Sequence, residues 1–161
     1  MAARPQREAR ASSPFHVTDE RMASSWQGYL WALADRLRCV VSDDPRALEA
    51  LIAPSTSHRW LSPPLADLAL VEEFLSTLTS HRFTDQQAAA AYPTFFCCVL
   101  GLLRINTANT ADPPAAGKCG SQGTAPVTER LRSSLSEDHS REDYEYAVEA
   151  LLERMERSLA S

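Results

Sequence analysis

The sequence predicts an all-α fold: a helical bundle of four to five helices around a central apolar helix, followed by a flexible loop and a C-terminal amphipathic helix. Several stretches begin with a helix-capping residue and continue with apolar residues three and four positions apart. One segment, 94–105, is apolar on nearly every side. The chain has 161 residues, 44% of them hydrophobic, which is enough for one domain with a real core.

We expect four parts along the chain. Residues 1–16 form a disordered tail, 17–106 the helical core, 107–126 a linker rich in Pro, Gly and Thr, and 127–161 a C-terminal helical segment. The tail is rich in Arg, Ala and Ser with a single acidic residue, so a mitochondrial transit peptide is the alternative for it.

The first helix is expected to begin near Thr18, a capping residue followed by two acids. Trp31 lies away from the centre of its apolar stripe. It is a candidate second contact surface, the alternative being that it packs against a neighbouring loop. The stripe itself consists of Met22, Trp26, Tyr29, Leu30, Leu33, Leu37, Val40 and Val41.

Two proline signals predict the next helices. Asp44 is the expected cap of a short helix whose first residue is Pro45, where a missing N–H costs nothing. Ser62 before Pro63 repeats this signal, and Trp60 in the preceding loop is expected in the core. The third helix is expected to bury Leu68, Val71, Phe74, Leu75 and Leu78.

The fourth element begins at a capping box, Thr84 with Gln87, and we expect Pro93 to break or kink it. The apolar residues beyond the proline then form the central helix of the bundle. Twelve residues, Tyr92 to Leu103, precede Arg104, whereas about twenty are needed to cross a bilayer.

The last helix is expected to begin at Ser140, with two acids in its first turn. It either completes the bundle or docks onto a partner. Its apolar face consists of Tyr144, Val148, Leu151, Leu152, Met155 and Leu159. Residues 146–152 also resemble the Y-x-x-x-x-L-Φ pattern with which some proteins bind the mRNA cap-binding initiation factor, but at about 100° per residue Tyr146 points away from this face.

No catalytic, metal or cofactor motif is recognisable, so we expect no catalytic residue, metal ligand or cofactor. The net charge of −5 argues against nonspecific nucleic-acid binding. Lys118 is the single lysine among 16 basic residues, and the arginines that replace it suit acidic partners or reflect a GC-rich genome. The adjacent Cys97 and Cys98 are expected as a buried pair of free thiols, the alternative being palmitoylation.

The functional prediction is therefore a noncatalytic adaptor or subunit of a larger assembly that contacts one or more proteins in the cytoplasm or nucleus. The expected contacts are the apolar face of the last helix and Trp31. One alternative is a helical enzyme with a site assembled from distant residues such as His58, His81 and Asp85. A second is reversible membrane association through residues 92–105, whereas the leading interpretation places these residues in the core.

Overall fold

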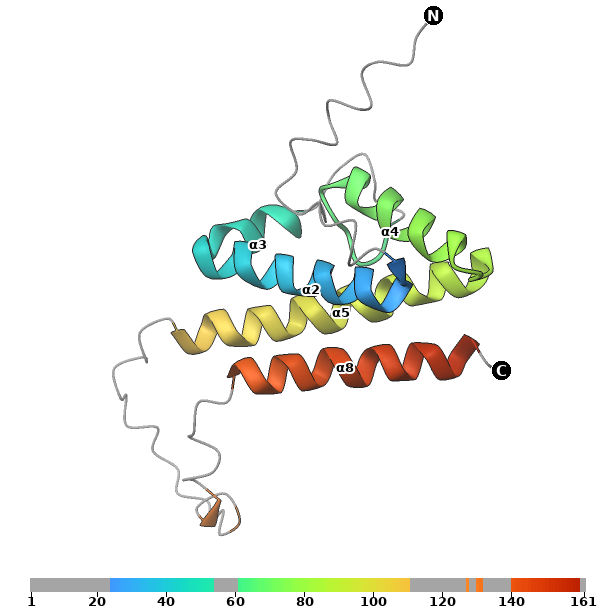
Figure 1. The fold of residues 1–161 in the computed structure, drawn as a ribbon. Coiled ribbons are helices and arrows are strands. Elements are labelled where there is room, and N and C mark those ends of the chain that lie inside the picture. The colour runs from blue at the N-terminus through green and yellow to red at the C-terminus, as the bar shows by residue number, and fades with distance from the viewer. Residues whose placement is uncertain (1–23, 54–60, 111–126, 128–129, 132–139, 160–161) are drawn as a thin grey trace, which may run out of the picture.

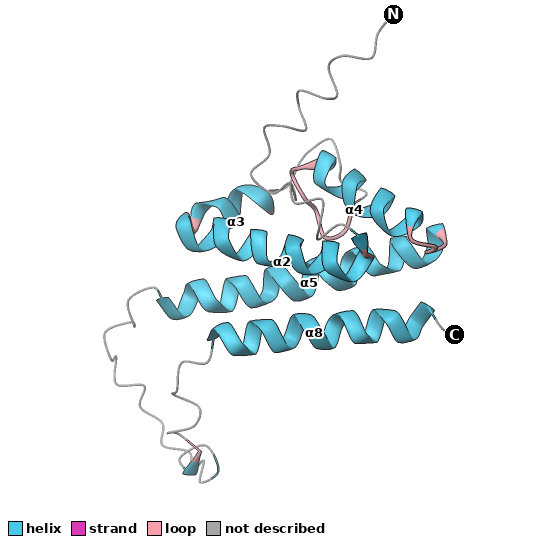
Figure 2. Ribbon diagram, in the orientation of Figure 1, coloured by secondary structure: helices cyan, strands magenta, loops and turns pink. Residues whose placement is uncertain are grey.

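A computed structural model describes residues 24–53, 61–110, 127, 130–131 and 140–159. Within this part of the chain, helices are the only regular elements and no strand occurs (Figure 2). The predicted all-α class is confirmed. The predictions for the N-terminal tail, Thr18, Trp60 and most of the linker concern residues outside the described ones.

Helix α5 (Asp85–Thr110) runs through the middle of the bundle and touches every other described helix (Figure 1). Figure 1 shows α8 alongside α5, with α3 and α4 on the opposite side of the molecule. A central apolar helix was predicted, and α5 takes that place. The other helices are α2 (Trp26–Asp43), α3 (Arg46–Leu51), α4 (Leu68–Ser80) and α8 (Ser140–Leu159).

Helix α2 begins at Trp26, later than the start expected near Thr18. The reason is a local cap: the Ser25 hydroxyl accepts a hydrogen bond from the Gly28 N–H at 3.0 Å, with Ser25 in an extended conformation. At the other end, α3 begins at Arg46 with Pro45 as its N-cap, one residue later than predicted, and the Asp44 carboxylate accepts from the Arg46 N–H at 3.0 Å.

The start of α4 differs from the prediction in the same way. Asp67, not Ser62, caps this helix, and its carboxylate accepts from the Leu70 N–H at 3.1 Å. Ser62 and Pro63 instead form a loop, in which the Pro63 carbonyl accepts a 2.7 Å hydrogen bond from the Tyr92 hydroxyl. Because α4 begins later than expected, Leu68 lies at its first turn and is 39% exposed.

The capping box at the start of α5 is present. Gln87 donates its N–H to the Thr84 hydroxyl at 3.2 Å and accepts from the Thr84 N–H at 2.9 Å. Pro93, however, does not end the helix, which continues to Thr110 and beyond the expected start of the linker. Aromatic side chains on both sides of Pro93 are anchored in the core, so packing outweighs the one hydrogen bond that proline removes.

The anchor is an aromatic cluster where α4 meets α5. Phe74 lies 5.4 Å from Phe95 and 5.2 Å from Phe96 between ring centroids, and Tyr92 lies 5.1 Å from Phe96. The three phenylalanines have no exposed surface. Such tilted and edge-on contacts add about 0.5–1.5 kcal/mol per pair beyond the area that the rings bury.

Candidate functional site

The structure places the predicted contact face of α8 inside the bundle. Its residues pack against α2 and α5, so α8 completes the core, one of the two outcomes left open by the sequence. Leu159, at the end of the helix, is only partly buried against the same core. The buried members and their exposed fractions are Tyr144 (2%), Val148 (0%), Leu151 (7%), Leu152 (8%) and Met155 (6%).

Two tyrosines of α8 show how the helix is oriented. The buried Tyr144 hydroxyl donates a 2.7 Å hydrogen bond to the Ala34 carbonyl of α2. Burial raises the pKa of Tyr144, and the nearby Arg38 charge opposes this only in part, so the phenol stays protonated. Tyr146, two residues later, is 74% exposed. It therefore points away from Leu151 and Leu152, and the residues of the Y-x-x-x-x-L-Φ pattern do not share one accessible face.

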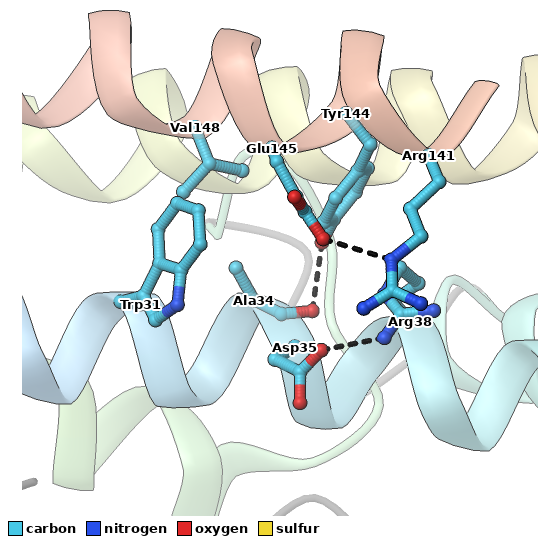
Figure 3. Close-up of a pocket in the computed structure, with 8 residues that line it drawn as sticks. All are labelled: Trp31, Ala34, Asp35, Arg38, Arg141, Tyr144, Glu145 and Val148. Atoms are coloured by element: carbon cyan, nitrogen blue, oxygen red, sulfur yellow. Dashed lines mark hydrogen bonds and ion pairs between the residues drawn. The ribbon is translucent and has the colours of Figure 1, made fainter. Parts of the chain in front are cut away.

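A groove of about 200 Å³ lies along the seam between α2 and α8 (Figure 3). In Figure 3, Trp31 stands at one end beneath Val148, and Arg141 descends from α8 toward Arg38 at the other. Trp31 is half-buried against the core, so the structure places this predicted anchor at the edge of a hollow rather than on an open surface.

Four charged side chains of this groove form two ion pairs. The Arg38 Nη2 lies 2.7 Å from the Asp35 Oδ1 within α2, and the Arg141 Nε lies 2.9 Å from the Glu145 Oε1 within α8. The hydrogen bond to Asp35 raises the pKa of Arg38, which keeps its charge at any physiological pH. Each pair contains one positive and one negative side chain, so the four residues together give the groove no net charge.

A second hollow, of about 250 Å³, lies between the first half of α5 and the end of α8. Its walls are mainly apolar. Two predicted contact residues, Met155 and Leu159, line it together with Phe83 and the small residues Ala90 and Thr94 of α5.

Sequence reasoning missed the outer face of α5. We use this name for the side chains of Ala90, Thr94, Cys97, Gly101 and Ile105, all exposed and three or four residues apart. Ile105 is 60% exposed. The helix buries most of its large side chains together with Ala88 and Ala91, whereas Ile105 is the one large residue of the outer face. This uneven distribution of large residues is the signal in the sequence that would have revealed the face.

The expected burial of Cys97 and Cys98 is therefore wrong in part. Cys97 is exposed and Cys98 is half-buried, both as free thiols. Burial raises the pKa of Cys98, and the charge of the adjacent Cys97 adds to this effect. Consecutive residues on a helix point about 100° apart, so one of the pair reaches the core while the other faces outward.

Only two of the three residues suggested for an enzyme site are described by the structure. His58 lies outside the described residues. His81 ends α4, where its Nδ1 lies 2.8 Å from the Thr77 carbonyl, and Asp85 is in the first turn of α5. Within the described residues, no group of three His, Cys, Asp or Glu side chains is placed to hold a metal ion.

Comparison with protein-family models, curated proteins and solved structures finds no match. By length and composition, one described helix is long and apolar enough to cross a membrane. Within its residues Asp85–Ala108 the mean hydropathy reaches 1.6, and 44% of that window is buried inside the protein. The sequence argument that the apolar stretch is too short to cross a bilayer is thus wrong, because α5 continues through Pro93. A core helix passes the same test.

Proposed function

We propose that this chain is a noncatalytic helical adaptor or subunit that acts through protein–protein contacts, with the outer face of α5 as its contact surface. The observation that carries the proposal is the exposure of this face combined with its lack of charge from Ala90 to Gly101, with the exposed Arg104 following near its end. From Gln86 to Leu103, α5 contains no acidic or basic residue.

An uncharged helix face in contact with water is unusual. Solvent-facing sides of helices are normally polar or charged, since the apolar stripe is the side that packs. Here most of the large residues already fill the core, yet the opposite side carries Thr94, Cys97 and Gly101 before its first charged residue, the exposed Arg104. Contiguous exposed surfaces of this kind mark interaction sites.

The small side chains on this face also suit contact with another helix. A Cβ placed on Gly101 would meet nothing within 4 Å, so a partner's backbone has room to approach closely. Toward the start of α5, Ala90 and Thr94 lead into the apolar hollow beside Met155 and Leu159. The contact surface therefore moves from α8, where the sequence placed it, to α5 and its border with the end of α8.

Gly101 offers a direct test with a matched control. Gly101→Arg places a charge in the middle of the outer face, and Gly101→Ala makes the same backbone change without the charge. Either side chain points into open space, and both residues favour helix over Gly by about 0.5–1 kcal/mol. Neither variant is therefore expected to unfold the protein.

The measurement is affinity purification of the full chain with quantitative mass spectrometry that reports the stoichiometry of each recovered protein. We expect a near-stoichiometric partner with the unchanged protein and with Gly101→Ala, and its loss with Gly101→Arg. Recovery of the chain alone, as a stable monomer, would contradict the adaptor function. Equal recovery of the partner with both variants would show that the contact surface is not the outer face of α5.

A second candidate, reversible association with a membrane surface, is favoured by the hydropathy of α5 and the exposure of Cys97, a position open to acylation. Crossing a bilayer is not part of this candidate, because α5 would have to leave its contacts with four helices. Flotation with liposomes, with and without Cys97→Ser and Cys98→Ser, tests it. Cysteine-dependent flotation supports it, and a protein that stays in the dense fraction excludes it.

A further inference from the structure

The groove between α2 and α8 contains more hydrogen-bond donors than its own carboxylates use. Arg38 bonds to Asp35 through Nη2, which also lies 3.9 Å from the Cys39 thiol, and Arg141 bonds to Glu145 through Nε. A guanidinium has five N–H groups in a planar fork. Within the described residues, Nε and Nη1 of Arg38 and both Nη groups of Arg141 therefore remain without a partner.

These donors come from two different helices and line the same hollow. The fork of an arginine matches a carboxylate in shape, and charged pairs of this kind are among the stronger hydrogen bonds in proteins. The existing pair holds Arg141 only loosely, because its side chain is 74% exposed and exposed ion pairs within one helix contribute little to stability. The Arg38 side chain is 24% exposed and lies closer to its partner Asp35, at 2.7 Å.

Two features indicate what kind of group fits. First, Asp35 and Glu145 neutralise the arginines, so a bare anion gains little from the groove, and an occupant must also make apolar contact. Trp31 at the other end supplies it. Second, a hollow of about 200 Å³ is smaller than the roughly 300–1,000 Å³ of typical small-molecule sites, and takes one or two side chains rather than a cofactor.

We propose that this groove binds a segment of a partner protein in which an acidic side chain, Asp or Glu, lies within a few residues of an apolar one. The carboxylate lies between Arg38 and Arg141, and the apolar side chain lies against Trp31. This inference rests on the proposed adaptor function and adds a second, chemically distinct contact surface. An aromatic anchor beside arginines is typical of positions that dominate the binding energy of an interface.

The test uses the full chain on an array of random peptides, followed by ¹H–¹⁵N spectra with the best peptide. We expect bound peptides to be enriched in Asp or Glu within a few residues of an apolar residue. The indole N–H signal of Trp31, assigned with Trp31→Phe, should shift on addition of the peptide. Replacing the acid of the peptide by its amide, or introducing Arg38→Gln or Arg141→Gln, should each weaken binding about tenfold.

Arg46→Gln is the control, since this exposed arginine lies on α3 outside the groove, and it should leave binding unchanged. Arg141 is largely exposed, so its variant keeps the test valid even if Arg38→Gln disturbs the fold. No enrichment for acidic peptides, or enrichment that survives both groove variants, overturns the proposal. A Trp31 shift produced equally by acetate alone also overturns it. The two proposals can also fail separately. If no peptide binds the groove, but a partner protein is recovered with the unchanged chain and lost with Gly101→Arg, the groove proposal is rejected and the adaptor function is not.

Discussion

Tyr144 and Tyr146 provide a matched pair for testing whether α8 belongs to the core. The two residues have the same chemistry and lie two positions apart on one helix, but their exposed fractions are 2% and 74%. Replacing each by Ala removes the same atoms from opposite sides of α8. If α8 completes the bundle, only the Tyr144 variant should lower the free energy of unfolding substantially.

The expected sizes follow from burial. Truncation of a fully buried aromatic residue to Ala costs about 3–5 kcal/mol, because apolar contacts are lost and a cavity remains. The hydrogen bond of the Tyr144 hydroxyl to Ala34 accounts for about 1 kcal/mol of this, which Tyr144→Phe should reveal separately. Tyr146→Ala changes an exposed side chain and should stay within about 0.5 kcal/mol of the unchanged protein.

The assay is urea unfolding followed by circular dichroism, with the free energy extrapolated to water. We expect the stability order to be Tyr146→Ala close to the unchanged protein, then Tyr144→Phe, then Tyr144→Ala. A loss below about 1 kcal/mol for Tyr144→Ala, or equal losses for both alanine variants, would refute the packing of α8. The face of α8 would then be available to a partner, as the sequence alone allowed.

Two further predictions concern pH and capping. Burial is the main reason why the pKa values of Tyr29, Tyr92 and Tyr144 lie above the ordinary 10.0, so the folded state holds these protons more tightly than the unfolded state. The free energy of unfolding should fall as pH rises above about 10, by up to about 1.4 kcal/mol per pH unit for each tyrosine, and tyrosinate absorbance during alkaline titration should show a cooperative transition. Thr84→Ala should lower stability by about 1 kcal/mol in thermal melts, because it removes the cap of α5. Thr94→Ala, whose hydroxyl bonds only within its own helix, should change it far less, and equal effects would contradict the capping role.

The helix starts show how far sequence reasoning reached. The capping box of Thr84 and Gln87 forms as predicted, and Asp44 accepts from the first N–H of α3 although Pro45 is the N-cap, since these hydrogen bonds involve residues only two or three positions away. For α2 and α4 a capping residue was recognised too early, because several Ser, Thr and Asp residues compete near each start. Which of these residues becomes the N-cap depends on where the apolar face of the helix meets the rest of the core.

The candidate surfaces were less predictable than the helices. The sequence suggested Trp31 as a candidate anchor but gave no sign that Arg38 and Arg141 line one groove with it, because α2 and α8 are far apart in the chain. The apolar run of α5 suggested a helix buried on all sides. Only the positions of its neighbours show that they cover the side of Phe95 and Phe96 and leave the side of Cys97 and Gly101 exposed.

By itself the sequence determined the helical class, the central place of the 94–105 segment and which residues of the last helix share an apolar face. Periodicity and capping are local properties, so they can be read from neighbouring residues. The tertiary structure decided that Tyr144 and its neighbours are core, that Pro93 lies within a continuous helix, and that α5 has an exposed face. An apolar stripe is the same for a core and for an interface, and only the contacts that cover it make the distinction.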